Sequence, residues 1–569
     1  MDDAFLQEMT DGYSFTEPSL LLGAPMLAGE VAASAPVWLP LSMVNRHGLV
    51  AGATGTGKTK TLQILAGQLS DAGVPVFVSD VKGDLTGISQ PGDATAAPIV
   101  ERAEQLGITY EPRGHPVELL SLSGALGAQV RATVSSFGPI LLGKVLDLNK
   151  TQVSVLTLVF AYCDDQRLPL VDLADLRTTL KFLASDSGKA TLEEYGGFSK
   201  ATIGVLLRSI VELEAAGAEA FFGEPEFDVH DLMRTTPDGR GIVSLLELAD
   251  VMDRPRLFST FMLWMLAQLY AQLPEEGDLP KPKLAFFFDE AHLLFDDASD
   301  ALMDQIELTA RLIRSKGVGV YFVTQGPADV PSSVLSQLGN RVQHALRSHT
   351  PEDESNLRKT VRTFPKSQYY DVGEMLTSLA IGEALVTVLT PKGVPTPLAA
   401  TRLVPPDSLM DAVDDATRLQ LIAEGSLRTK YAEPVDRESA HEMIKARLDG
   451  AAEIVAEVEG LPAPGADVRV DGAALPPPPP GDPATSGASA PAPGSGRVSK
   501  PAAKTTGSDR AKPSAPEKQK GSTDPRSHDD GRLADDVKDI GVGFAKDMLT
   551  TADGRRTLRT VFGALFGKR

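Results

Sequence analysis

The segment at residues 48–59 reads Gly-Leu-Val-Ala-Gly-Ala-Thr-Gly-Thr-Gly-Lys-Thr. A short apolar run leads into a glycine-rich loop, and the loop ends in Lys58 and Thr59 ahead of a helix-compatible sequence. Glycines allow successive backbone N–H groups to turn inward around a phosphate, and the following helix adds the positive end of its dipole. The spacing Gly-x-x-x-x-Gly-Lys-Thr therefore predicts a phosphate-binding loop, or P-loop.

This motif assigns a task to each of its polar residues. Lys58 is expected to reach the β- and γ-phosphates, and the Thr59 hydroxyl is expected to bind Mg²⁺. The sequence thus predicts ATP and Mg²⁺ as cofactors. The residues expected to surround the nucleotide here are Gly52, Ala53, Thr54, Gly55, Thr56, Gly57, Lys58, Thr59 and Lys60.

Continuous apolar runs alternate with helical patterns on both sides of the P-loop. Such runs are expected as buried strands at residues 74–80, 241–246, 284–288, 318–324 and near 341–346. Strands that are apolar on both faces and separated by helices indicate an α/β fold with a mainly parallel sheet. Between residues 135 and 235 the apolar spacing becomes helical, which predicts a helical insertion within this core.

Composition divides the chain further. Residues 461–535 are rich in Pro, Ala, Gly and Ser, and such a segment cannot bury enough apolar area to offset its ordering entropy, so we expect a disordered linker. The expected segments are a short β-rich N-terminal segment (1–47), the first part of an ATPase core (48–134), the helical insertion (135–235), the second part of the core (236–430), a helical extension (431–460), the linker (461–535) and a basic amphipathic C-terminal segment (536–569).

Charge and cysteine content limit the cellular setting. The formal net charge is −21, which argues against a uniformly basic surface but not against a ring with a basic interior. Cys163 is the single cysteine, so no disulfide within the chain and no cysteine-based zinc site can form. With no apolar run long enough for a membrane span, we expect a cytoplasmic protein.

A second motif supplies the residues that ATP hydrolysis requires. The apolar run at 284–288 ends in Asp289 and Glu290. Asp289 is expected to act on the Mg²⁺ side, as a Walker B acid, and Glu290 as the general base that activates water. The run at 318–324 ends in Gln325, which we expect to sense the γ-phosphate or hold the attacking water. Together with the P-loop, these residues predict an ATPase.

These motifs, in this chain order, resemble the HerA/FtsK superfamily of ring-forming DNA-pumping ATPases. The Gly83-Asp84-Leu85 turn and the helical insertion are similar to bacterial HerA-like proteins. The resemblance covers roughly residues 15–430 and implies a RecA-like ATPase core. By motif position it also implies that Arg314 is an arginine finger, and that Arg46 and Asp80 belong to the nucleotide site.

The resemblance also implies partners. It implies a homo-oligomer, with a hexamer expected, and double-stranded DNA as the substrate of a translocase or helicase. Only residues 1–47 precede the P-loop strand, whereas HerA-type helicases carry a substantial N-terminal barrel that docks a nuclease, so a nuclease partner is not expected. The C-terminal segment is a candidate contact for a protein partner.

Two other functions remain open from the residues alone. The first is an ATPase that assembles or remodels protein partners without translocating. The second, a small-molecule kinase, fits less well because Glu290 beside Asp289 suits activation of water. Stimulation of hydrolysis by DNA would separate the motor from the remodelling ATPase.

Overall fold

The computed structural model describes residues 2–195, 197, 199–251, 255–295 and 300–459. The predicted linker and C-terminal segment therefore lie outside the described residues. Of the two compact units in the chain, the first contains residues 2–449, and the second contributes only the end of the last helix to the described part.

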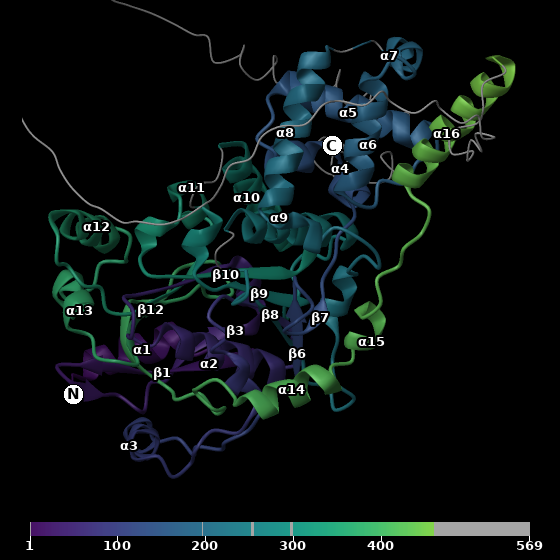
Figure 1. The fold of residues 1–569 in the computed structure, drawn as a ribbon. Helices are drawn as coiled ribbons and strands as arrows, with labels where there is room; N and C mark the ends of the chain where they lie inside the picture. Colours follow the sequence, from purple (N-terminus) through teal and green to yellow (C-terminus); the bar gives the residue numbers. More distant parts are fainter. Residues whose placement is uncertain (1, 196, 198, 252–254, 296–299, 460–569) are drawn as a thin grey trace, which may run out of the picture. The chain divides into compact units, whose positions relative to one another are not determined.

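The α-helices and strands follow one another along the chain (Figure 1). The strands are β1 (Ser19–Leu27), β2 (Glu30–Val31), β3 (Val37–Pro40), β4 (Gly48–Ala51), β5 (Val76–Asp80), β6 (Val117–Ser121), β7 (Ala128–Gln129), β8 (Val243–Glu247), β9 (Leu284–Phe288), β10 (Val318–Thr324), β11 (Asn340–Gln343), β12 (Glu383–Thr387) and β13 (Ala399–Leu403). The α-helices are α1 (Asp3–Tyr13), α2 (Lys58–Asp71), α3 (Ala97–Leu106), α4 (Val134–Val145), α5 (Lys150–Asp165), α6 (Leu173–Ala184), α7 (Lys189–Glu194), α8 (Lys200–Ala215), α9 (Pro255–Gln272), α10 (Asp300–Leu312), α11 (Ser332–Leu335), α12 (Pro351–Val361), α13 (Val372–Ser378), α14 (Asp415–Glu424), α15 (Arg428–Tyr431) and α16 (Ala440–Glu459).

All of these strands belong to one 13-stranded sheet, in the order β2-β1-β13-β12-β11-β4-β10-β9-β5-β8-β6-β7, with β3 also paired to β1. From β11 to β7 every neighbouring pair is parallel. From β11 to β1 the pairs are antiparallel. The expected α/β class with a mainly parallel sheet is confirmed.

Alternate residues of the central strands face two different cores. In β9, Leu284, Phe286 and Phe288 belong to one cluster of buried side chains, whereas Ala285 and Phe287 belong to the other. The first cluster contains side chains of α9 and of helices α4, α5, α6 and α8, and the second contains side chains of α2 and α1. Because both faces of β9 are covered, its sequence is apolar throughout rather than alternating.

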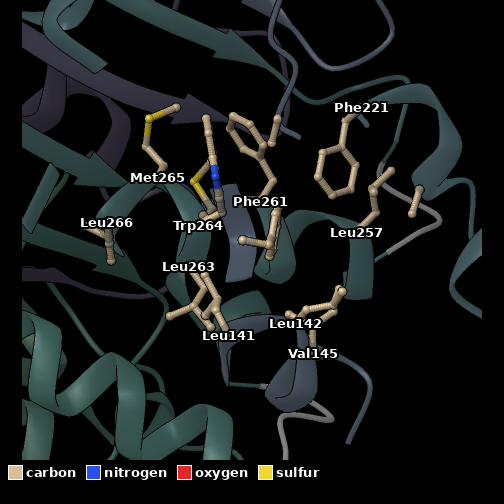
Figure 2. Close-up of a cluster of buried hydrophobic side chains, with 14 of the residues drawn as sticks. Leu141, Leu142, Val145, Phe221, Leu257, Phe261, Leu263, Trp264, Met265 and Leu266 are labelled. Atoms are coloured by element: carbon tan, nitrogen blue, oxygen red, sulfur yellow. The ribbon is translucent and has the colours of Figure 1, made fainter. Parts of the chain in front are cut away.

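Helices α4 to α8 follow β7 and lie together in the blue part of Figure 1. They connect to the sheet through α9. Figure 2 shows Leu141, Leu142 and Val145 of α4 beside side chains of α9. Trp264 of α9 is fully buried, and its indole N–H donates to the Ser136 hydroxyl over 3.0 Å. The apolar packing and this hydrogen bond join α4 to α9.

Helix α1 was not foreseen from the sequence of the β-rich N-terminal segment. Phe5, Met9 and Tyr13 recur at helical spacing and are fully buried. The Tyr13 hydroxyl donates a 2.6 Å hydrogen bond to the Pro397 carbonyl. The helix therefore packs against a segment almost four hundred residues away in sequence, which a local pattern cannot reveal.

The buried His115 links its own segment, before β6, to the end of α2 and to the segment after β13. The His115 side chain is fully buried, with Nε2 3.0 Å from Asp407 Oδ1 and Nδ1 3.5 Å from Asp71 Oδ1. Burial by itself lowers the pKa of His115, but the hydrogen bonds and charges of Asp407 and Asp71 outweigh it and raise the pKa to about 9. His115 is therefore a charged clamp between the end of α2 and the segment after β13.

Candidate active site

The P-loop connects the end of β4 to the start of α2. Gly57 has φ 111°, a backbone conformation that residues with a side chain rarely adopt. A Cβ on Gly52 would lie 2.4 Å from the Cβ of His344, so only glycine fits that close approach. The loop therefore wraps tightly around the first turn of α2, as the motif predicts.

The Lys58 side chain folds back onto the backbone of this loop. Its Nζ donates to the carbonyl oxygens of Gly52, over 2.7 Å, and of Ala53, over 3.3 Å. Burial lowers the pKa of Lys58, while the nearby charge of Glu290 acts in the opposite direction. The side chain is half-buried, so its ammonium group is available to an anion that enters the loop.

His344 packs against Gly52 of the P-loop and contacts Thr61 of α2, and the sequence did not predict this role. It follows β11, is fully buried, and its Nε2 lies 2.8 Å from the Thr61 hydroxyl of α2. Burial lowers the pKa of His344 to about 4, so the ring is neutral at pH 7. The contact joins residues separated by almost three hundred positions, and no motif marks it.

Asp289 and Glu290 follow β9, two strands away from β4 in the sheet. Because β9, β10 and β4 are parallel, their carboxyl ends meet at one edge, which we call the carboxyl edge. Asp289 is only 3% exposed, and its Oδ2 has no hydrogen-bond partner among the described residues. Burial, with the charges of Glu290 and Asp80, raises the pKa of Asp289 to about 7. A bound cation would favour the ionised form of this carboxyl.

Glu290 adopts a left-handed backbone conformation with φ 46°, which is uncommon for a residue other than glycine. One carboxylate oxygen pairs with Lys82 Nζ, and the other lies 3.4 Å from His292 Nδ1. Burial alone would raise the pKa of Glu290, but the hydrogen bond and charge of Lys82 hold it below its usual value. Glu290 is thus an ionised carboxylate near Lys58. No sequence motif marks Lys82 as a residue of the site.

Asp80 ends β5 at the same edge and is fully buried. Oδ1 accepts the backbone N–H groups of Lys82 and Gly83, over 3.2 and 2.7 Å, and Oδ2 accepts that of Leu85 over 2.9 Å. Burial raises the pKa of Asp80 to about 6 despite these bonds. Asp80 shapes the turn that carries Lys82, while its contact with a nucleotide stays a prediction.

Three other residues predicted for the nucleotide site, Gln325, Thr59 and Lys60, have different surroundings. Gln325 is exposed after β10 and, with Ala53, Thr54 and Arg347, lines a cavity of about 430 Å³. Thr59 is partly exposed at the start of α2. Lys60 instead donates from Nζ to the carbonyl oxygen of Met410, which turns its ammonium group toward the segment after β13.

A second cavity, of about 620 Å³, also borders the P-loop and shares Leu346 and Arg347 with the first. It is lined by Gly55 and Thr56 of the loop together with Arg102 and Arg402, and by Ile381, whose side chain is largely exposed. The two arginines are partly committed: Arg102 donates to the Gly382 carbonyl over 3.0 Å, and Arg402 pairs with Glu383 over 2.6 Å. The cavity therefore extends the phosphate site toward the antiparallel half of the sheet.

Arg46 and Arg314 lie at the opposite edge of the sheet, where the parallel strands begin, which we call the amino edge. Arg46 ends the 3₁₀ helix Leu41–Arg46 before β4, and Arg314 lies in the 3₁₀ helix Ile313–Lys316 before β10. Both reach Asp278, whose Oδ1 is 3.0 Å from a nitrogen of Arg46 and 3.7 Å from one of Arg314. The structure does not bring either arginine to the P-loop of its own chain, so their role at a nucleotide stays a prediction.

The donor set fits the expected cofactors. Backbone N–H groups, Lys58 and Thr59 suit a polyphosphate, and the unpartnered oxygen of Asp289 suits a hard cation. No group of three or more His, Cys, Asp and Glu side chains in the described ranges is arranged to hold a metal ion.

The family model described as helicase HerA-like C-terminal matches residues 26–471. The chain belongs to this family. The predicted membership of the HerA/FtsK superfamily is therefore confirmed, and the chain is a P-loop ATPase of the HerA/FtsK type. Among proteins with curated descriptions, none matches this chain.

Three solved structures with a similar path of the chain are distant in sequence. The bacterial conjugative coupling protein TrwB, in an unbound form lacking N-terminal residues, is 15% identical, with 72% of this chain and 94% of that chain covered and a TM-score of 0.44. TrwB with the GTP analogue GDPNP is 14% identical, with 70% and 98% covered and a TM-score of 0.45. VirB4 of Thermoanaerobacter pseudethanolicus is 13% identical, with 68% and 98% covered and a TM-score of 0.42.

The sequence contains no apolar run long enough for a membrane span. Among the described residues, no helix is both long and apolar enough to cross a membrane.

Proposed function

We propose that this HerA-like ATPase is a ring-forming motor that hydrolyses Mg-ATP to move along double-stranded DNA. One observation carries the proposal: the residues that the sequence predicts for ATP hydrolysis are divided between two edges of one sheet. The P-loop, Asp289 and Glu290 lie at the carboxyl edge, whereas Arg46 and Arg314 lie at the amino edge. A head-to-tail contact between two copies would bring both sets to one nucleotide, and repetition of that contact closes a ring.

The expected roles follow from position and chemistry. Lys58 would bind the β- and γ-phosphates, while Thr59 and Asp289 would hold Mg²⁺, which supplies charge neutralisation on the phosphate oxygens. Glu290, already ionised, would accept a proton from the attacking water, and Gln325 would orient that water. Arg314 of a neighbouring copy would stabilise charge that develops on the γ-phosphate, with Arg46 beside it.

The larger cavity has a role in the same scheme. It begins at Gly55 and Thr56, where the phosphates would end, and it offers the apolar side chain of Ile381 next to two arginines. We place the ribose and base of the nucleotide there, because a base needs a flat apolar contact and a ribose needs polar neighbours.

The wider setting is part of the proposal. We expect a hexamer in the cytoplasm, with DNA in its central channel. The single cysteine, Cys163, is buried, which agrees with a reducing compartment. The basic C-terminal segment, residues 536–569, lies outside the described residues and remains a candidate contact for a protein partner.

The competing function is an ATPase that remodels protein partners. The two are separated by the steady-state ATPase rate with and without long double-stranded DNA, at low and at moderate salt, with Glu290→Gln as the blank. A motor should be stimulated by DNA, and the stimulation should fade with salt because contacts to phosphates release counterions. A rate that is indifferent to DNA at both salt concentrations would reject the motor and favour the remodelling ATPase.

A further inference from the structure

The turn after β5 carries a lysine into the ATPase site that the scheme above does not use. The backbone N–H groups of Lys82, Gly83 and Leu85 all donate to the carboxylate of Asp80. Gly83 has φ 70°, which closes the turn. The backbone of Lys82 is therefore fixed, whereas its side chain is 46% exposed and can move.

The partner of Lys82 is held much more firmly. The Glu290 side chain is 7% exposed and is separated from the buried strand β9 only by Asp289, and Lys82 Nζ pairs with its Oε1. The charges of Lys82, Glu290 and Lys58 all act on one another. The ammonium groups of Lys82 and Lys58 thus both act on the carboxylate of Glu290 beside the P-loop.

This arrangement sets up a competition when ATP arrives. The γ-phosphate brings negative charge to the region between Lys58 and Glu290. Lysine is a compact charge on a flexible stem, so it can exchange one anionic partner for another with little rearrangement. Lys60, which follows Lys58 in α2, donates to the Met410 carbonyl and so points elsewhere. Lys82 is the lysine that pairs with Glu290, the expected base.

We propose that Lys82 distinguishes ATP from ADP: it pairs with Glu290 when no γ-phosphate is present and binds the γ-phosphate when ATP is bound. The exchange frees the carboxylate of Glu290 for the attacking water only when there is a phosphate to cleave. The inference rests on the proposed role of Glu290 as the base.

The test compares the binding of Mg-ADP and of a Mg-bound non-hydrolysable ATP analogue to variants of the full chain. Lys82→Met should weaken binding of the analogue about tenfold, the loss of one charge-assisted hydrogen bond, while changing ADP binding less than twofold. Lys82→Arg should recover most of the loss. Lys392→Met is the matched control, since Lys392 is an exposed lysine in the turn between β12 and β13.

A double-mutant cycle tests the competition itself. Because Glu290 competes with the γ-phosphate for Lys82, Glu290→Gln should tighten binding of the analogue more in the presence of Lys82 than in the Lys82→Met background. Equal weakening of ADP and analogue by Lys82→Met would mean that Lys82 only shapes the loop, and the inference would be overturned. An additive cycle would overturn it as well.

Failure of this inference can be told apart from failure of the base assignment. If Glu290→Gln hydrolyses ATP at the wild-type rate, Glu290 is not the base, whatever the binding data show. If that variant is inactive but Lys82→Met binds both nucleotides normally, the base assignment stands and the role of Lys82 does not.

Discussion

The division of the site between two edges of the sheet makes a quantitative prediction for mixtures of two inactive variants. In β10, Val318–Thr324 separates Arg314 from the end of the strand beside the P-loop. At about 3.3 Å per residue these seven residues span roughly 20 Å, far beyond the reach of an arginine side chain. Arg314 can therefore serve only the P-loop of another copy. We expect Arg314→Ala alone to lower turnover roughly 10³-fold, as loss of an arginine finger does, with nucleotide binding nearly intact.

Glu290→Gln alone should also be inactive while still binding ATP. In a ring assembled from equal amounts of the two variants, a site is complete when one copy supplies Glu290 and its neighbour supplies Arg314. Random assembly gives that combination at about one quarter of the interfaces, because each neighbour is correct half of the time. The mixture should therefore recover roughly a quarter of the wild-type rate.

The assay co-expresses the two variants with different tags, purifies rings that carry both, and measures steady-state ATPase activity. A wild-type chain co-expressed with its own tagged copy is the control for assembly. A mixture no more active than the two variants measured separately would refute the shared site. Normal hydrolysis by Arg314→Ala alone would remove this arginine from the mechanism.

Two further predictions concern the P-loop and the buried clamp. Lys58→Ala should abolish nucleotide binding, measured with a fluorescent ATP analogue, while circular dichroism stays unchanged, because the lysine packs on the loop without supporting the core. His115→Gln should lower the free energy of unfolding by up to about 3 kcal/mol near pH 6. The folded pKa of about 9 lies above the unfolded value of 6.5, so this stabilisation is fully present below pH 6.5 and is lost as the pH rises through 9. Urea midpoints of both proteins at pH 6 and pH 9.5 measure it, and an equal difference at the two pH values would contradict the charged clamp.

Much of the core could be predicted because its chemistry restricts the sequence. The P-loop has few sequence solutions, since glycine is required where a Cβ would meet His344 and where φ is positive at Gly57. The strands β9 and β10 are apolar on both faces, and their predicted bounds, 284–288 and 318–324, agree with the structure. The family and the ATPase activity that these motifs predicted are confirmed.

What the sequence did not reveal depends on contacts between distant segments. Lys82 becomes a site residue only because β5 and β9 are adjacent, which places it beside Glu290 across more than two hundred residues. His344 supports the P-loop through the pairing of β11 with β4. Likewise, the ion pair of Arg46 with Asp278 joins residues more than two hundred positions apart, and no local pattern marks it.

The central claim, that hydrolysis drives movement along DNA, is tested most directly by displacement of a bound obstacle. A triplex-forming oligonucleotide is annealed at one end of a linear duplex, the protein is added with Mg-ATP, and release of the labelled third strand is followed over time. We predict release by the wild-type protein that requires ATP and increases in delay with the length of duplex to be crossed, and no release by Glu290→Gln. A protein that hydrolyses ATP in the presence of the duplex but leaves the third strand in place would contradict the account.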